Sequence, residues 1–428
     1  MTEQEIAGLG PAFTTYLKRF RDSFGQDRTA KHFDTYCRGL LSDLPRKSVE
    51  PIALAAGTAV RTLQEFLVTS VWKHDSARNT FQQHLKTVIV DLPDDPLGTI
   101  GVIDETSCRK WGEDTPGVQR QYLGCVGKVD SGIVTVHIGV AKGPFQALLD
   151  ADLFLPKSWS DDRPRCRAAG TPDNVTHRTK WRLAMDQVLR LAGNGVTFDW
   201  LVFDEGYGAA VPFLRLLNVV NQRFVAEVPV SFSVRDKVGG PSRRADARLT
   251  AADAKGGKRH RIAHRTVRAS FWRATSARVW VADREHTLVA AVDEATGEVK
   301  YFVTNATTVL LSRVLAVAFR RWTVEHAFRL GKQEAGLLDY EGRDYTGLLR
   351  HLTLALLVLG FVACHTQRLR GEKPRGNSGA GVPSVEPTVR SSVPPPPRRP
   401  RTSTHQQRHL LPPEAKQAGG QVPQETAA

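Results

Sequence analysis

The stretches "GVIDETS" at residues 101–107 and "LVFDEGYG" at residues 201–208 decide the fold prediction. Each is a short apolar run that ends in Asp-Glu, and each is predicted to be a buried strand of one sheet. An isolated buried carboxylate is costly, because its charge loses contact with water. Two buried strands that both end in acids therefore predict a site for a cation.

Asp104 and Asp204 directly follow the two apolar runs, so both are placed at the end of a strand. If the strands are neighbours, the two carboxylates meet at one edge of the sheet. Hard oxygen ligands of this kind suit Mg²⁺, and also Mn²⁺. Neighbouring strand residues point to opposite faces. One acid of each pair is therefore expected to bind metal, and Glu105 and Glu205 are expected to lie outside the metal site.

A third carboxylate is offered by "FRRWTVEHAFRLGKQEAG" at residues 319–336. Arg321, Glu325 and Lys332 are four and then seven residues apart, which places them on one face of a helix. Taken alone, this spacing is that of ion pairs within a helix, each of which stabilises the helix by about 0.2–0.5 kcal/mol. Together with the two aspartates, it is interpreted as a third metal ligand between two cations that contact phosphate. Three carboxylates can hold two ions roughly 3.5–4 Å apart, as in displacement at phosphorus.

Three segments, "VIDETS", "LVFDEGYG" and "RRWTVEHAFRLGK", resemble the catalytic segments of DDE insertion-sequence transposases with an RNase H-like core. The last segment is similar to the YREK signature, and the resemblance, to a subgroup common in high-GC bacteria, covers roughly residues 20–368. It implies that Asp104, Asp204 and Glu325 are the catalytic triad and bind two Mg²⁺ ions, with Mn²⁺ as a substitute. It also implies that Arg321 and Lys332 contact DNA phosphates.

The sequence departs from this resemblance at one signature position. The tyrosine of the signature would fall at Ala318. Related transposases carry an insertion before the third acid that handles the transposon end, in some cases by stacking a flipped base on a tryptophan. By that resemblance Trp272 is taken as a DNA-binding residue, with Trp280 as a second candidate. The alternative for either is a tryptophan packed in a β-sheet core.

The order of predicted elements indicates an α/β fold with an RNase H-like mixed sheet. Five segments are expected: a helical DNA-binding domain (1–95), the first part of the catalytic core (96–228), a basic β-rich insertion (229–304), the second part of the core with the helix bearing Glu325 (305–368), and a disordered Pro/Arg-rich tail (369–428).

Three details of the core can also be predicted. Residues 120–143 are expected to form a hairpin around "DSG" (130–132). Helical periodicity runs from about 309 to 335 and from 346 to 368. The apolar stretch "LTLALLVLGFVAC" (352–364) is expected to be a core helix, too short to span a bilayer.

The charge of the chain points to a polyanionic partner. The formal net charge is +15, and between Arg235 and Arg273 twelve Lys or Arg stand against three acids. Such a surplus favours nucleic acid over membrane, so the expected partner is double-stranded DNA, at transposon ends and target, with no membrane and no small-molecule substrate. The resemblance implies a homodimer on DNA. No secretory signal is visible, and the five cysteines are scattered, so a cytoplasmic, nucleoid-associated bacterial protein is expected.

Two alternatives stay open beside the transposase. One is another RNase H-like DNA nuclease, such as a repair or junction enzyme. The other is a catalytically inactive DNA-binding protein derived from a transposase, which the Pro/Arg-rich sequence after His365 brings into consideration.

Overall fold

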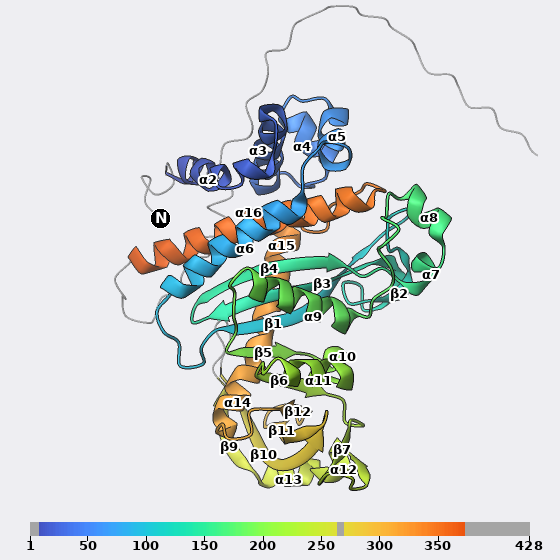
Figure 1. Cartoon of the computed structure of the whole chain (residues 1–428). Coiled ribbons are helices and arrows are strands. Elements are labelled where there is room, and N and C mark those ends of the chain that lie inside the picture. Colours follow the sequence, from blue (N-terminus) through green and yellow to red (C-terminus); the bar gives the residue numbers. More distant parts are fainter. Residues whose placement is uncertain (1–7, 263–268, 373–428) are drawn as a thin grey trace, which may run out of the picture.

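The computed structural model describes residues 8–262 and 269–372 (Figure 1). Of the tail predicted from residue 369, residues 369–372 belong to the last helix, and residues 373–428 lie outside the described residues. Along the long axis of Figure 1, the N-terminal helices lie at one end, the central sheet lies in the middle, and the insertion lies at the other end.

The N-terminal segment is helical, as predicted. Its elements are α2 (Leu9–Lys18), η1 (Arg21–Ser23), α3 (Asp27–Leu41), α4 (Val49–Ala55), α5 (Val60–Val68) and α6 (His74–Asp91). Aromatic side chains at helical spacing fill the interior of this bundle, including Phe13, Phe20, Phe33 and Phe66, all of which are buried. Helix α6 leaves the bundle and lies beside α16 over the sheet (Figure 1).

The central sheet has the RNase H-like order β4-β3-β1-β5-β6. Its strands are β1 (Ile100–Arg109), β3 (Lys128–Lys142), β4 (Phe145–Leu153), β5 (Trp200–Phe203) and β6 (Phe224–Val228). Strands β1, β5 and β6 are parallel to one another, whereas β3 is antiparallel to both β1 and β4. The predicted fold class is therefore confirmed.

Short helices connect the strands and cover the sheet. They are α7 (Lys157–Ser160), α8 (Arg163–Ala168), α9 (Lys180–Gly193), α10 (Glu205–Gly208) and α11 (Val211–Val219). Helix α9 packs on β3 and β4, opposite the face that α15 covers. Both faces of the sheet are thus occupied, which explains why its central strands read as continuous apolar runs.

Two predicted strand boundaries are wrong. Strand β1 continues past Asp104 to Arg109, because β3 pairs with it over its whole length while the parallel pairing with β5 stops at Ile103. The hairpin turns at 124–127, between β2 (Gln119–Leu123) and β3, and not at "DSG". Gly132 lies inside β3, where a Cβ atom would collide with the carbonyl oxygen of Cys108 on β1. This glycine permits a close approach of strands and forms no turn.

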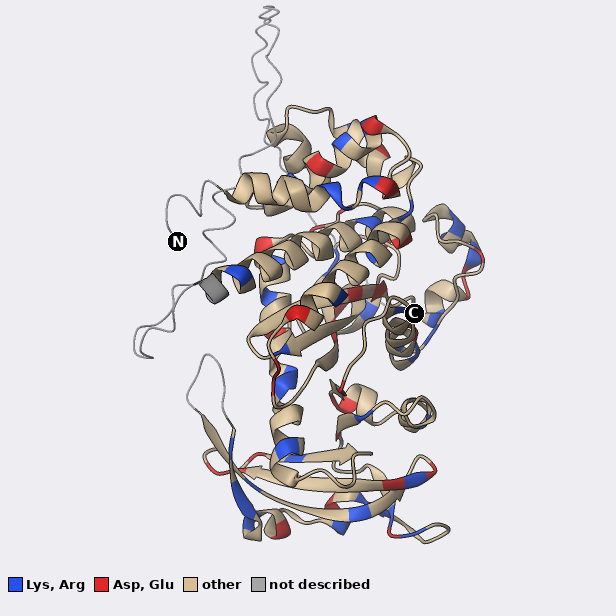
Figure 2. Cartoon of the chain, turned by 60° about the vertical axis from the view of Figure 1, so that its left-hand side comes forward, with Lys and Arg blue, Asp and Glu red and all other residues tan. Residues whose placement is uncertain are grey.

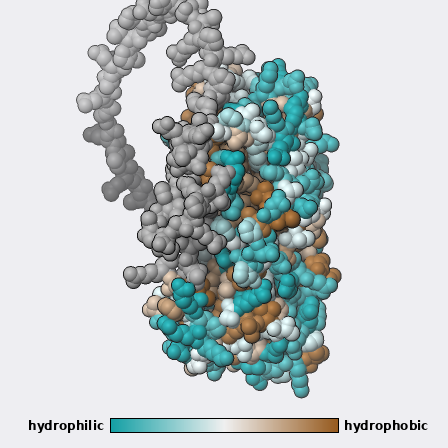
Figure 3. Space-filling view, turned by 90° about the vertical axis from the view of Figure 1, so that its left-hand side faces the viewer, coloured by the Kyte–Doolittle hydropathy of each residue, from teal (hydrophilic) through white to brown (hydrophobic). Residues whose placement is uncertain are grey.

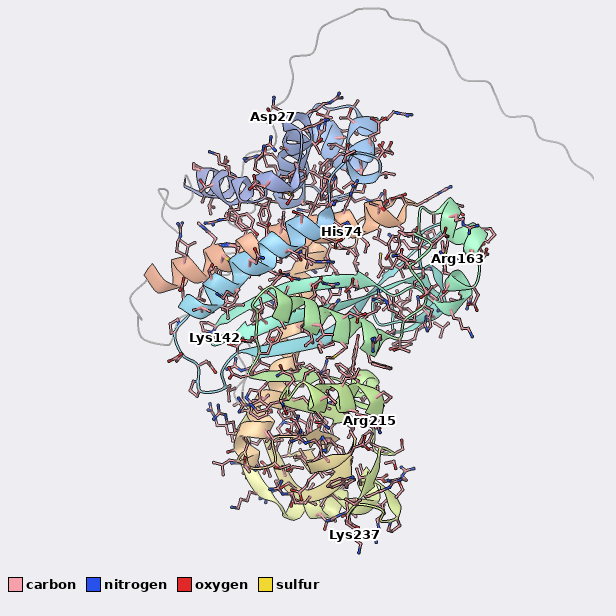
Figure 4. The ribbon with its side chains drawn as sticks, in the orientation of Figure 1. Asp27, His74, Lys142, Arg163, Arg215 and Lys237 are labelled. Atoms are coloured by element: carbon pink, nitrogen blue, oxygen red, sulfur yellow. The ribbon has the colours of Figure 1, made fainter. Side chains whose placement is uncertain are left out.

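The insertion extends the same sheet. It comprises β7 (Ser233–Arg235), β8 (Ser242–Arg244), α12 (Ala245–Arg248), α13 (Ala251–Gly256), β9 (Lys258–Ile262), β10 (Ser270–Val281), β11 (Arg284–Asp293) and β12 (Val299–Thr304). Strand β12 pairs with β6, so the insertion is hydrogen-bonded to the core. Figure 2 shows Lys and Arg along its strands and short helices. At its border, Arg215 of α11 forms an ion pair with Asp283 (Arg215 is labelled in Figure 4).

The C-terminal helices differ from the predicted continuous helix over 309–335. Helix α14 (Leu311–Ala318) is followed by the 3₁₀ turn η2 (Phe319–Trp322) and by α15 (Thr323–Glu334). Helix α16 (Tyr345–Glu372) is longer than expected and long and apolar enough to cross a membrane, but 72% of its most apolar window is buried inside the protein. It serves as a core helix, as predicted. On the face of the molecule shown in Figure 3, the apolar side chains lie in small patches among hydrophilic ones.

Three basic side chains fasten the N-terminal helices to the core by capping helix C-termini. Lys47 donates hydrogen bonds to Leu40 O at the end of α3 and to Glu334 O at the end of α15. Lys142, at the end of β3 (Figure 4), donates to Ile89 O and Leu92 O at the end of α6. Arg350 of α16 donates hydrogen bonds to Leu67 O in the last turn of α5 and to Ser70 O just after that helix. The last carbonyls of a helix have no partner within it, so buried cations there satisfy groups that would otherwise be unpaired.

Candidate active site

Asp104 lies in the middle of the sheet and is buried. Its Oδ2 accepts a hydrogen bond from Arg321 Nη1 at 3.0 Å, and its Oδ1 accepts one from the backbone N of Glu105 at 2.7 Å. Burial, and next the negative charge of Asp204, raise the pKa of Asp104 to about 7, although Arg321 opposes the rise. The ionised carboxylate is therefore costly at this position unless a cation lies beside it, and in the structure that cation is Arg321.

Asp204 occupies the neighbouring strand end. Ile103 pairs with Phe203 in the parallel ladder of β1 and β5, so Asp104 and Asp204 follow it side by side. Asp204 is the N-cap of α10, where its Oδ1 accepts from the backbone N of Gly206 at 3.0 Å and of Tyr207 at 3.4 Å. The strand-to-helix turn thus holds this carboxylate at the sheet edge.

Arg321, Glu325 and Lys332 reach the same place from the C-terminal helices. Arg321 lies on η2, while Glu325 and Lys332 lie on α15, and Arg321 Nη1 is 3.9 Å from Glu325 Oε1. Burial alone would lower the pKa of Arg321, but the acids around it, Asp104 first, raise it above its usual range. Within the described residues Lys332 forms no ion pair, so its charge is available to a ligand.

One open cleft, hereafter the carboxylate cleft, contains all five residues and encloses about 1210 Å³ of space that is partly open to solvent. Its walls come from β1, β2 and the turn after it, the junction of β5 and α10, η2 and α15. The lining residues are Asp104, Glu105, Thr106, Ser107, Tyr122, Gly124, Cys125, Asp204, Arg321, Glu325, Phe328, Arg329, Lys332 and Gln333.

The partner acid of each Asp-Glu pair has a different role. Glu105 Oε1 is 2.6 Å from Lys180 Nζ of α9, so this acid is used in an ion pair with the helix on the opposite side of the sheet from α15. Glu205 is exposed at the start of α10 and does not line the carboxylate cleft.

A fourth acid, Glu227 on β6, was missed by sequence analysis. Its Oε2 is 3.7 Å from Arg321 Nε, and its Oε1 is 2.5 Å from Lys300 Nζ of β12. It helps to orient Arg321 toward Asp104. Its signal was an acid inside a third apolar run, "FVAEV" at 224–228, on the next parallel strand.

The structure places Trp272 in the core. It is 1% exposed, its ring lies 4.7 Å from that of Phe319, and its Nε1 donates to Ser270 Oγ. In this arrangement no base can stack on it, which matches the alternative of a packed tryptophan. Ala318, at the position of the signature tyrosine, is also buried.

A comparison with protein families identifies the relatives of this chain. The profile described as DDE superfamily endonuclease matches residues 19–290, well over half of the chain. The chain belongs to the DDE superfamily of endonucleases. The matched segment includes Asp104 and Asp204, whereas Glu325 lies beyond its end.

A curated relative agrees with this membership of the DDE superfamily. The chain is 30% identical, over 216 residues, to the "Probable transposase for insertion sequence element IS701" of Microchaete diplosiphon. The matched region covers 50% of this chain and 52% of the relative, so the chain spans about half the length of the curated relative that it matches.

Membership of the DDE superfamily implies divalent metal ions. The side chains of the carboxylate cleft have the chemistry to bind such ions. Asp104 and Asp204 are adjacent hard oxygen donors, and Glu325 is an exposed side chain on the facing helix. In residues 8–262 and 269–372, however, no three His, Cys, Asp or Glu side chains stand together closely enough to hold an ion. Arg321 lies between Asp104 and Glu325 and forms an ion pair with each of them.

Proposed function

We propose that this protein is a DNA transposase that cleaves and joins phosphodiester bonds at the ends of an insertion sequence. The observation that carries the proposal is the carboxylate cleft, where Asp104 and Asp204 face Glu325 across Arg321 and beside Lys332. The name of the curated relative and membership of the DDE superfamily support the same conclusion.

The side chains of the cleft have distinct proposed tasks. Asp104, Asp204 and Glu325 would hold two Mg²⁺ or Mn²⁺ ions, which supply Lewis-acid stabilisation and an activated oxygen nucleophile. Arg321 leaves its ion pair with Asp104 and contacts the scissile phosphate. Lys332 contacts a neighbouring phosphate as a point charge. The positive charge that balances the acids in the free protein thus becomes available to DNA.

The partner of this cleft is double-stranded DNA, both transposon end and target. The N-terminal helices and the basic insertion, at opposite ends of the molecule in Figure 2, are proposed to hold the duplex on either side of the cleft. We further propose that two copies act together on paired ends, in the cytoplasm at the nucleoid.

Cleavage should depend on a divalent ion. With transposon-end DNA, we expect strand cleavage in Mg²⁺ or Mn²⁺ and loss of cleavage in excess chelator, because three carboxylates repel a phosphate unless cations stand between them. The measurement is a gel assay of nicked DNA, with restoration by added Mg²⁺ as the control. Undiminished cleavage in chelator would exclude the proposed site.

Lys332 should contribute binding without contributing chemistry. In Lys332→Ala we expect weaker binding to the same DNA and a log Kd against log salt slope shallower by about one, since one phosphate contact is lost. Lys332→Arg is the matched control, because it keeps the charge and should keep the slope. A Lys332→Ala slope equal to that of wild type would mean that Lys332 touches no phosphate.

A catalytically inactive, transposase-derived DNA-binding protein is the second candidate. It is favoured by Ala318, which replaces the signature tyrosine, and by the placement of Arg321 between two of the acids. A strand-transfer assay separates the candidates, because only the transposase joins a donor 3′-OH to target DNA.

A further inference from the structure

Tyr122 is an aromatic side chain that does not pack into the core. It lies on β2 and is 64% exposed, although it lines the carboxylate cleft. Within the described residues, its hydroxyl makes no hydrogen bond and its ring contacts no other aromatic ring. A ring held this way contributes little to the core, and it is grouped with two other exposed apolar side chains, Val126 and Val129, at the wall of the cleft.

The register of the sheet places Tyr122 on the same face as Asp104. Tyr122 pairs with Val129 of β3, and Asp104 pairs with His137 of β3. Val129 and His137 are eight residues apart on one strand, and alternate residues share a face. Tyr122 and Asp104 therefore project from the same side, no more than about 26 Å apart along the strand at ~3.3 Å per residue.

The surroundings of Tyr122 combine an apolar floor with positive charge. Val129, directly across the ladder, and Val126 in the adjoining turn are both exposed beside it. Arg329 and Lys332 line the same cleft from α15. An aromatic ring on an apolar floor, next to cations that attract phosphates, is the combination that binds the bases of single-stranded nucleic acid.

We infer that Tyr122 is a stacking platform for an unpaired base of the DNA strand processed at Asp104 and Asp204. The base lies a few nucleotides from the scissile phosphate, with its ring on Tyr122 and its edge against Val129. This inference rests on the proposed function and adds the preference for an unpaired nucleotide near the cut. The competing occupant, a second copy of this chain at the β2 edge, would cover the wall of the cleft that DNA must enter.

The test compares two DNA probes, a blunt duplex and the same duplex with a short single-stranded 3′ overhang. Wild type should prefer the overhang probe. In Tyr122→Ala the affinity for the overhang probe should fall about 5- to 150-fold, the range for loss of one base-aromatic stack. Affinity for the blunt duplex should be nearly unchanged. The salt slope should also stay the same, because no phosphate contact is lost.

Two variants serve as controls. Tyr122→Phe keeps the ring and should bind both probes like wild type. Trp111→Ala removes a more exposed ring, 85% exposed, which contacts the Arg109 guanidinium at 4.0 Å and does not line the cleft. It should bind both probes like wild type.

Several outcomes overturn the inference. They are an equal loss on both probes in Tyr122→Ala, an equal loss in Trp111→Ala, or a dissociated dimer in Tyr122→Ala by sedimentation, which would assign β2 to a second copy. Unchanged overhang preference in Tyr122→Ala would reject the platform while leaving the proposed function intact, because cleavage at Asp104 and Asp204 is measured separately.

Discussion

Asp104→Asn and Asp204→Asn should each reduce DNA cleavage by roughly 10³-fold or more, because each removes a charge that acts on the transition state. Binding of the same DNA should persist or tighten, since an acid facing phosphates has been removed. Both changes keep the side-chain size, and Asn remains a good N-cap at position 204. The measurement is parallel: mobility shift and cleavage in Mg²⁺ on one DNA.

Loss of cleavage in Asp104→Asn should come without loss of folding stability. Burial raises the pKa of Asp104 to about 7, above its ordinary value. The ionised form is therefore disfavoured in the folded protein, and this acid lowers stability progressively as pH rises through that range. At pH 8 Asp104→Asn should unfold at a denaturant concentration at least as high as wild type. An inactive and less stable variant would indicate a structural role.

Glu205→Gln is the matched control for Asp204→Asn. Glu205 is the next residue, exposed and outside the cleft, so its loss of charge should leave cleavage close to wild type. Glu105→Gln loses the ion pair with Lys180 and should also retain most cleavage. If the two glutamate variants are dead and the two aspartate variants active, the assignment within each pair is reversed. If none of the four matters, the protein is not a nuclease of this kind.

The acids of the site could be found in the sequence because of a simple conflict. An apolar run long enough for a buried strand places the acid at its end close to the core, where an unpaired charge is costly. Asp104 and Asp204 therefore stand out in the sequence. Glu325 stands out less, since its spacing to Arg321 and Lys332 also occurs in surface helices. Its predicted role as a metal ligand depended on the two aspartates, and in the structure all three acids line the carboxylate cleft.

Other features depend on contacts that a one-dimensional pattern does not contain. Strand β1 extends to Arg109 because a distant strand pairs with it, and Gly132 reads as a turn although it permits strand contact. Trp272 could be exposed or buried by pattern alone, and its packing on Phe319 decided the matter. Tyr122 was passed over because a tyrosine in a predicted hairpin strand is unexceptional until its face is known.

The hydrogen bonds that join the N-terminal helices to the core could not be predicted from the sequence either. Lys47, Lys142 and Arg350 read as surface charges between apolar residues, yet their donors meet backbone carbonyls from distant segments. Lys47 has a direct bearing on the site, because it binds the last carbonyl of α15, the helix that carries Glu325 and Lys332. The domain expected to bind DNA is thereby joined, through the buried Lys47, to the helix that carries Glu325.

Arg350→Met should lower the free energy of unfolding by about 3 kcal/mol or more, since buried acceptors left without donors cost roughly 1–3 kcal/mol each. Arg350 is 6% exposed, and its two Nη atoms donate to Leu67 O at 2.9 Å, Ser70 O at 2.9 Å and Trp72 O at 2.5 Å. Its guanidinium also lies 4.6 Å from the centre of the Trp72 ring. The measurement is the urea midpoint, with limited proteolysis of the segment after α5.

Arg343→Met is the matched control, because Arg343 is an exposed arginine whose ion pair with Asp114 is also exposed. Such pairs contribute about 0–1 kcal/mol, so this variant should unfold close to wild type. Arg350→Lys should fall between the two, because an ammonium keeps the charge but cannot span several carbonyls as a planar guanidinium does. Burial lowers the pKa of Arg350 to about 10, so the side chain stays charged at neutral pH. The comparison of Arg350 with Arg350→Lys therefore tests the geometry of the hydrogen bonds and not the charge. Equal midpoints for Arg350→Met and Arg343→Met would mean that water replaces the guanidinium without cost, and that α16 holds the N-terminal helices by apolar packing alone.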